Sequence, residues 1–189
     1  MSGKASGRRP RADALRNREG LIDAAKAAFA EIGPEVSLEE IARRAGVGIG
    51  TLYRHFPARD DIIAAVYRRE VDQLGDAATA LLAENPPLEA LGAWLKLAID
   101  YLATKKLIVP ALGTMTGGSA ALVAHSGSRL IGAVNEMVNA ARQAGVLRTG
   151  VEPNDLMQAL AALAYNTGAP GWRESAERVA DIIVAGLRA

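Results

Sequence analysis

The chain has 189 residues, 50% of them hydrophobic, and a formal net charge of +1. This length and composition suffice for one or two compact domains with a sizeable core. The absence of cysteine excludes a disulfide framework, a thiolate metal site and a cysteine nucleophile, and it is compatible with a reducing cytoplasm. The basic N-terminus lacks an apolar signal core, and no segment has the length and purity of a membrane span. We therefore expect a cytoplasmic protein without a membrane partner.

Positive charge is concentrated at the N-terminal end. Residues 1–59 contain 11 Lys and Arg against 7 Asp and Glu, whereas residues 60–189 contain 11 against 14. Residues 1–13 have almost nothing to bury, which predicts a disordered basic arm. Its arginines Arg8, Arg9 and Arg11 could lie along phosphates or enter a minor groove, or the segment could be a solvated tail.

A first domain is predicted over residues 14–58. From about Ala14, apolar residues recur every three to four positions, and Gly33 with Pro34 end this helix. The apolar stripe consists of Leu21, Ile22, Ala25, Phe29 and Ile32. Such a helix has too little apolar surface to be stable alone, so we expect it to pack across the two short helices that follow.

The first short helix has a strongly marked start. Ser37 can cap it, and Glu40 stands three residues later for the reciprocal bond of a capping box. Val36 and Ile41 occupy the positions of a hydrophobic staple. After the helix, the pair Gly46 and Gly48 surrounds the turn, where left-handed backbone angles cost glycine little.

The second short helix is expected from about Ile49 to Phe56, before Pro57. Its polar side carries Thr51, Arg54 and His55, and Tyr53 lies between the polar and apolar sides; these side chains suit base edges and phosphates. The two helices and their turn have the sequence form of a helix-turn-helix, whose second helix enters the DNA major groove. The glycines could instead belong to a phosphate-binding loop, but such a loop follows a strand, and a capped helix precedes this one.

Residues 59–189 predict a second, helical domain. The expected helices run from about residue 59 or 60 to 84, 88 to 104, 107 to 112, 120 to 144, 153 to 167 and 173 to 187. No stretch alternates as a strand would, so we predict an all-α fold of about nine helices. The last helix is apolar on more than one face, which favours contact with both its own domain and a second copy, although it could be fully internal.

With these motifs in hand, the chain resembles the TetR family of bacterial transcriptional regulators. The resemblance covers about residues 17–61 and rests on Ser37-Leu38-Glu39-Glu40-Ile41-Ala42, Ala45-Gly46-Val47, Gly50-Thr51-Leu52-Tyr53 and His55-Phe56. It implies an operator-binding homodimer, usually a repressor, that a small and largely apolar molecule releases from a palindromic operator. It also implies a small-molecule pocket in the second domain and pairing of the last two long helices across a two-fold axis.

The resemblance implies particular DNA contacts. By position these are Ser37, Arg44, Gly48, Thr51, Tyr53, Arg54, His55 and Arg59. Ser37 would cap its helix and approach a phosphate, Arg44 would contact a phosphate, and Gly48 would allow the DNA backbone to come close. Arg59 stands where the family often has lysine; it keeps the charge but changes the hydrogen-bond geometry.

Pocket and interface residues are predicted from the helix pattern alone. Polar or aromatic side chains expected to face inward are Tyr67, Trp94, Tyr101, Met115, His125, Asn135, Tyr165, Asn166 and Trp172. The predicted dimer interface comprises Leu156, Leu160, Leu163, Val179, Ile182 and Ile183. We interpret Lys105 and Lys106 as a solvated helix end.

An enzyme has little support in the sequence. The two histidines, His55 and His125, form neither a metal motif nor a nucleophile-base pair, so we predict no metal, no cofactor and no catalytic site. The adjacent acidic residues at 39–40 and 60–61 stand at helix starts, where the helix dipole explains them. Two alternatives remain: a ligand-independent architectural DNA-binding protein, and a helical domain that docks another protein.

Overall fold

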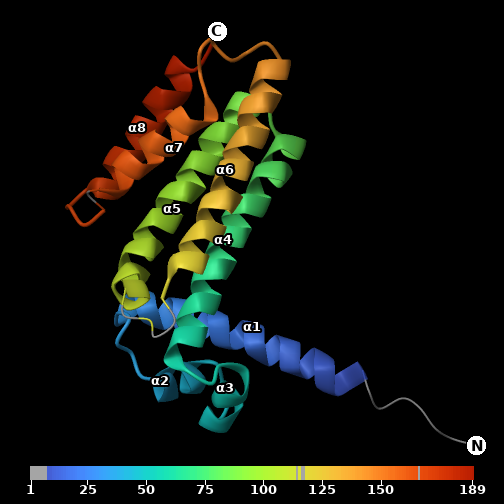
Figure 1. The fold of residues 1–189 in the computed structure, drawn as a ribbon, viewed down its shortest axis with the longest axis vertical. Helices are drawn as coiled ribbons and strands as arrows, with labels where there is room; N and C mark the ends of the chain where they lie inside the picture. The colour runs from blue at the N-terminus through green and yellow to red at the C-terminus, as the bar shows by residue number, and fades with distance from the viewer. Residues whose placement is uncertain (1–7, 114, 116–117, 166) are drawn as a thin grey trace, which may run out of the picture. The chain divides into compact units, whose positions relative to one another are not determined.

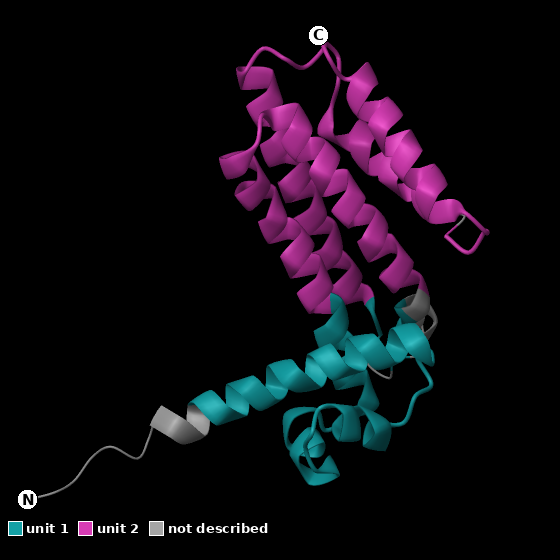
Figure 2. Cartoon of the chain, turned by 180° about the vertical axis from the view of Figure 1, so that it is seen from behind, with its two compact units in different colours: residues 1–67, 107–119 teal, residues 68–106, 120–189 magenta. Residues whose placement is uncertain are grey.

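The computed structural model describes residues 8–189 except 114, 116, 117 and 166. This part of the chain forms eight helices and no strand, which confirms the predicted all-α class (Figure 1). It divides into two compact units, residues 1–67 with 107–119 and residues 68–106 with 120–189 (Figure 2). The boundary falls after Tyr67, inside a helix, whereas the sequence placed the end of the first domain at residue 58.

Three helices carry the core of the first unit: α1 (Arg8–Glu31), α2 (Leu38–Arg44) and α3 (Ile49–His55). Each contacts the other two. Their shared core contains Leu21, Phe29, Ile41, Leu52 and Phe56, each at most 2% exposed. The two aromatic side chains Phe29 and Phe56 are therefore both buried in this core.

Two details of α1 differ from the prediction. The helix begins at Arg8 rather than near Ala14, so residues 8–13 of the predicted arm are helical. Pro10 is compatible with this, because the first backbone N–H groups of a helix have no partner within it. Ile32 was expected in the buried stripe but is 56% exposed, since the helix ends at Glu31 and the chain turns away at Gly33.

The remaining helices are α4 (Arg59–Glu84), α5 (Pro87–Gly113), α6 (Ala120–Gln143), α7 (Pro153–Ala164) and α8 (Trp172–Gly186). The starts at Arg59, Ala120 and Pro153 agree with the sequence. The separate helices expected at 88–104 and 107–112 are one helix, and the count is eight rather than nine.

Sequence signals explain several helix ends in the second unit. Gly145 takes a left-handed φ of 68° after α6, where glycine has no Cβ to clash. The backbone N–H of Glu152 donates to Asp155 Oδ2 at 2.9 Å before α7, which begins with Pro153. None of the described helices is both long and apolar enough to cross a membrane.

A charged cluster joins α4 to α6 in the second unit. Arg129 Nη2 donates to Asp76 Oδ1 at 2.5 Å, and its Nε lies 3.3 Å from Asp72. His125 Nε2 lies 2.9 Å from the same Asp72 carboxylate. The Arg129 guanidinium lies 2.8 Å from the position that a Cβ on Gly75 would occupy. Gly75 thus leaves room for this arginine, while α4 continues as one helix.

Candidate nucleic-acid interface and internal cavity

The start of α2 is fixed by the predicted cap, but only half of the predicted capping box is made. Ser37 Oγ accepts a hydrogen bond from the Glu40 N–H at 3.2 Å. The Glu40 carboxylate turns to two arginines instead, accepting from Arg43 at 2.7 Å and from Arg44 at 2.8 Å. These bonds, that from Arg43 first, lower the pKa of Glu40 to about 2.

The turn between α2 and α3 needs one left-handed glycine. Gly46 has a φ of 69°, and its N–H donates to Arg43 O at 3.1 Å while that of Val47 donates to Ala42 O at 3.0 Å. Gly48 was predicted to share this geometry but is extended, with φ −72° and ψ 151°, because it serves as the N-cap of α3. No atom lies within 4 Å of the position its Cβ would take. Its backbone is therefore open to an approaching molecule.

Helix α3 buries one side and exposes the other. Leu52 is fully buried, whereas Tyr53 is 46% exposed. Arg54 is exposed, and its Nη2 and Nε donate to Thr51 Oγ1 and Gly50 O, both at 3.1 Å. None of the chain's acidic residues, all of which are described, forms an ion pair with Arg54. The outer face of α3 thus carries hydrogen-bonding groups and an unneutralised positive charge.

His55 lies at the edge of this outer face. It is half-buried, and its ring centroid is 6.4 Å from that of Phe56. The Phe56 ring also faces the Arg18 guanidinium of α1, which lies 5.3 Å from the ring centroid. The C-terminal end of α3 is therefore held against α1 through Phe56.

Two other predicted DNA contacts, Arg44 and Arg59, are engaged within the protein. Arg44 donates to Glu40 and, at 2.8 Å, to Glu31, which links α2 to α1. Arg59 Nη1 donates to Val36 O at 2.7 Å, and its Nη2 donates to the carbonyl of Pro34. Both side chains are part-buried by these contacts and hold the helices and loop of the first unit in place.

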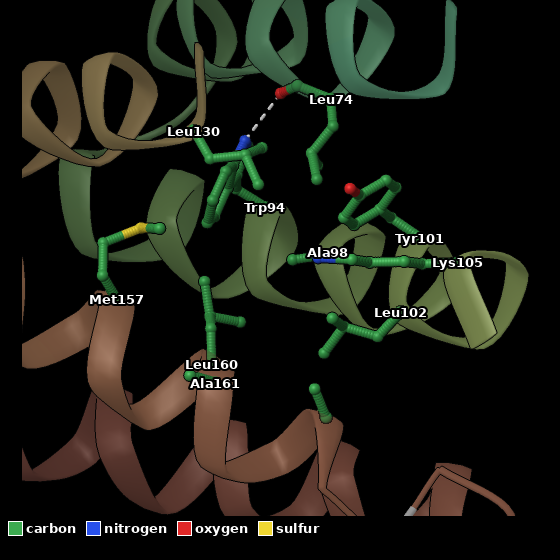
Figure 3. A pocket seen from close by; sticks show the side chains of 11 residues that line it. Leu74, Trp94, Ala98, Tyr101, Leu102, Lys105, Leu130, Met157, Leu160 and Ala161 are labelled. Atoms are coloured by element: carbon green, nitrogen blue, oxygen red, sulfur yellow. Dashed lines mark hydrogen bonds between the residues drawn. The ribbon is translucent and has the colours of Figure 1, made fainter. Parts of the chain in front are cut away.

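The second unit contains a cavity of about 230 Å³ between α4, α5, α6 and α7 (Figure 3). Its lining is mostly apolar: Leu74, Trp94, Ala98, Tyr101, Leu102, Lys105, Leu130, Met157, Leu160, Ala161 and Ala164. Trp94 and Tyr101 are the predicted pocket residues that line it. Trp94 Nε1 donates to Leu74 O at 2.8 Å, and the Tyr101 hydroxyl lies 3.2 Å from Ser126 Oγ, so both rings are held in position.

Lys105 also lines this cavity, contrary to its interpretation as part of a solvated helix end. The side chain is half-buried and extends along the cavity wall, with Nζ 5.8 Å from the Tyr101 ring centroid (Figure 3). Lys106, the next residue, is exposed. The signal was present in the sequence, because Tyr101 and Lys105 are four residues apart and therefore neighbours on a helix surface.

The other described pocket candidates are not among the residues that line this cavity. Tyr67 is buried in the first unit, to which Met115 also belongs, and His125 is paired with Asp72. Asn135 is exposed, as is Tyr165, at 95%. Trp172 Nε1 donates to Leu163 O at 2.8 Å, and Asn166 lies outside the described residues.

The predicted interface residues separate into two groups. Leu156 and Leu160 are buried within the chain's own second unit, and Leu160 lines the cavity, so they offer no free surface. Val179 and Ile182 on α8 are exposed, Ile182 at 69%. Leu163 and Ile183 are half-buried. An apolar surface is therefore present on α8, whereas much of α7 packs inward.

A capped helix, a left-handed glycine turn and a second helix with a polar outer face define the first unit as a helix-turn-helix DNA-binding domain. Residues 21–66 match the family model described as bacterial regulatory proteins, tetR family. Residues 86–189 match the C-terminal domain of SbtR-like transcriptional regulators. The chain belongs to the TetR family, and it is a DNA-binding transcriptional regulator rather than an enzyme.

Similar structures extend over nearly the whole chain. The TetR transcriptional regulator SCO0520 from Streptomyces coelicolor is 40% identical, with a TM-score of 0.81 over 90% of this chain and 98% of that one. A TetR regulatory protein from Mycobacterium vanbaalenii is 33% identical, with a TM-score of 0.78 over 95% and 99%.

A sequence match to a curated regulator is more local. A helix-turn-helix-type transcriptional regulator from Staphylococcus aureus, SAUSA300_2515, is 41% identical over 63 residues, 33% of this chain and 34% of the relative. The matched stretch thus spans about a third of this relative.

Proposed function

We propose that this protein is a homodimeric repressor that binds a palindromic operator and is released from it by a small, largely apolar ligand. One observation carries the DNA-binding part: α3 buries Leu52 while its outer face carries Tyr53 and an Arg54 without an acidic partner. Side chains of this kind on a rigidly packed helix can contact base edges and phosphates in the major groove.

The candidate contacts divide by role. Thr51 and Arg54 contact base edges, and the Tyr53 hydroxyl, His55 and Ser37 contact phosphates or the edge of the groove. Gly48 lets the DNA backbone approach the start of α3. A side chain at this position would project away from the protein and would lie between α3 and the DNA backbone. Arg44 and Arg59 position these groups, since their guanidinium groups already bond to Glu31, Glu40 and two carbonyls. Contact between the N-terminal arm and DNA stays a prediction; its arginines Arg8, Arg9 and Arg11 belong to the start of α1, and residues 1–7 lie outside the described part.

A single copy of α3 is long enough for only a half-site, so a palindromic operator requires two copies about 34–36 Å apart, one turn of DNA. We propose that α8 supplies the pairing surface. Val179 and Ile182 are exposed on it, and exposed apolar side chains on a two-fold axis bury each other. The exposed alanines Ala161 and Ala162 on α7 permit close approach of a partner helix.

The cavity in the second unit is the proposed effector site. Its wall includes Leu74 of α4, the same continuous helix that begins at Arg59. A ligand that shifts α4 would therefore move Arg59, whose guanidinium bonds to two carbonyls in the loop before α2. Release from DNA requires the ligand to bind the released state more tightly than the DNA-bound state, since otherwise no equilibrium changes.

The DNA-binding part is tested by fluorescence anisotropy with a palindromic duplex from the region upstream of the gene and a scrambled duplex of equal composition. We expect tighter binding of the palindrome, two chains per duplex, and affinity that falls by a factor on the order of 10³ between 50 and 200 mM salt if about six phosphates are neutralised. Equal affinity for both duplexes at moderate salt would favour an architectural DNA-binding protein.

A further inference from the structure

Among the described residues that line the cavity of the second unit, one is charged. Lys105 Nζ lies 5.8 Å from the Tyr101 ring centroid, and the other lining residues are apolar apart from the Tyr101 hydroxyl and the Trp94 indole. Both of those groups already have bonds, to Ser126 and to the Leu74 carbonyl. Lys105 is therefore the cavity's main free hydrogen-bond donor and its source of charge (Figure 3).

No acidic residue of the chain neutralises Lys105. All 21 Asp and Glu residues lie in the described part, and none forms an ion pair with its Nζ. Asp100, which precedes it by five residues on α5, is paired with Arg173 of α8. The Tyr101 ring face attracts the ammonium group and holds it beside the cavity, but an aromatic ring accepts none of its three hydrogen bonds in full.

We propose that the effector of this protein is a small amphipathic anion, a monocarboxylate with an apolar body, whose carboxylate pairs with Lys105 while the body occupies the space beside Trp94. This inference rests on the proposed role of the cavity as the effector site, and it adds the chemical class of the ligand. It also makes Lys105 the residue that determines specificity.

The chemistry of the wall selects against other classes of ligand. A neutral apolar molecule would cover the ammonium group without replacing its lost hydration, and burial of an unpaired charge is unfavourable. A cation would be repelled by Lys105. A carboxylate regains the lost hydration with charge-assisted hydrogen bonds, while its hydrocarbon part covers Leu102, Leu130 and Leu160.

The volume limits the size of the ligand. A cavity of 230 Å³ is smaller than the roughly 300–1,000 Å³ of sites that enclose drug-sized ligands. An eight-carbon carboxylate whose head group remains at Lys105 has the appropriate size, and octanoate is the corresponding probe.

The test compares three probes of equal chain length: octanoate, 1-octanol and octylamine. Binding to the full chain is measured by calorimetry and by tryptophan fluorescence, to which Trp94 contributes. We expect octanoate to bind at least about tenfold more tightly than either other probe. The inference is overturned if 1-octanol or octylamine binds as tightly as octanoate, or if octanoate does not bind.

Variants at neighbouring lysines identify the responsible group. Lys105→Met keeps the length of the side chain and should weaken octanoate binding by about tenfold or more, whereas 1-octanol, which no longer covers an unpaired ammonium group, should bind at least as tightly as before. Lys105→Arg should retain most of the binding, and Lys106→Met, at an exposed lysine, should have no effect. Unchanged octanoate binding in Lys105→Met overturns the assignment, and thermal unfolding of each variant checks that the fold is intact.

A separate measurement distinguishes this inference from the proposed function. Operator binding is measured by anisotropy with and without octanoate at a saturating concentration. Release from DNA that is lost in Lys105→Met supports both. Selective octanoate binding that leaves operator affinity unchanged supports the ligand class and contradicts ligand-controlled release. If octanoate still releases the Lys105→Met variant from DNA, the result contradicts the role of Lys105 but not ligand-controlled release.

Discussion

The outer face of α3 and the cavity of the second unit present polar groups in opposite ways. On α3, Arg54 and Tyr53 extend outward from a fully packed core, whereas Lys105 lines a mostly apolar cavity. In the sequence, Arg44, Arg54, Arg59 and Lys105 are alike in carrying one positive charge each. Their surroundings separate them: Arg44 and Arg59 bond to the protein itself, and Arg54 and Lys105 have no acidic partner. The contacts of a basic residue, rather than its charge, indicate whether it holds other parts of the protein in position or is available to bind DNA or a ligand.

The largest effect is expected in the core beneath α3. Phe29→Ala should lower the free energy of unfolding by about 3–5 kcal/mol, because it leaves a cavity in a fully packed site. Ile32→Ala, an exposed apolar residue three positions later, is the matched control and should change it by less than about 0.5 kcal/mol. Urea unfolding followed by circular dichroism measures both. Equal effects would show that the first unit is not packed as described.

The next largest effect tests the positioning role of Arg59. Arg59→Met removes two hydrogen bonds from a charged donor and should destabilise the protein by about 1.5–3 kcal/mol, with a parallel loss of operator affinity. Arg59→Lys keeps the charge but cannot bond to both carbonyls with one planar group. If Arg59→Lys is as stable as the original protein and binds operator equally well, Arg59 acts through its charge on a phosphate instead.

The helix-turn-helix could be predicted from local signals because its boundaries are chemical. Ser37, Gly46, Pro57 and Pro153 each act within one turn of their own position, and the structure has helix ends at or beside them. Glu40 does not complete the predicted capping box, because two nearby arginines outcompete the backbone N–H of Ser37 for its carboxylate. Gly48 does not adopt the predicted left-handed backbone angles, because it is the N-cap of α3 and its backbone there is extended.

The cavity could be predicted only in part because its residues come from four helices. Trp94 and Tyr101 are large and occur at helical spacing, which marked them as inward-facing. Leu160 and Ile182 both fit an apolar stripe, yet one is buried and the other is 69% exposed. The orientation of each helix about its axis decides this, and periodicity alone does not fix it. Lys105 was missed because its four-residue spacing from Tyr101 makes the two side chains neighbours on the helix but does not say whether that side of the helix faces a cavity or solvent.

A smaller effect should separate binding from positioning on α3 itself. Arg54→Ala should reduce discrimination between the operator and a singly mismatched duplex by about 1–3 kcal/mol, if Arg54 contacts a base. Its unfolding free energy should change by less than about 0.5 kcal/mol, because the side chain is exposed. Anisotropy and urea unfolding measure the two quantities. A uniform loss of affinity for all duplexes would assign Arg54 to a phosphate.

The smallest effect concerns how the stability of the fold decreases at acid pH. The pKa of Glu40 falls from 4.5 to about 2 on folding. The contribution of the ionised Glu40 carboxylate to the free energy of unfolding is therefore complete above pH 4.5 and is lost as the pH falls toward 2. Glu40→Gln should remove this part of the pH dependence, whereas Glu39→Gln, an exposed neighbour, should retain it. Thermal unfolding between pH 2 and 5 measures the difference, and identical profiles for Glu40→Gln and the original protein would contradict the ion pairs with Arg43 and Arg44.

The central claim is that the outer face of α3 recognises a base sequence and that two copies do so together. Selection of duplexes from a randomised pool at about 150 mM salt, followed by sequencing, tests it most directly, because this salt suppresses non-specific phosphate binding. The account predicts enrichment of an inverted repeat whose half-sites are centred about one helical turn apart. Recovery of a pool without a shared sequence, or of a single unrepeated site, would contradict it.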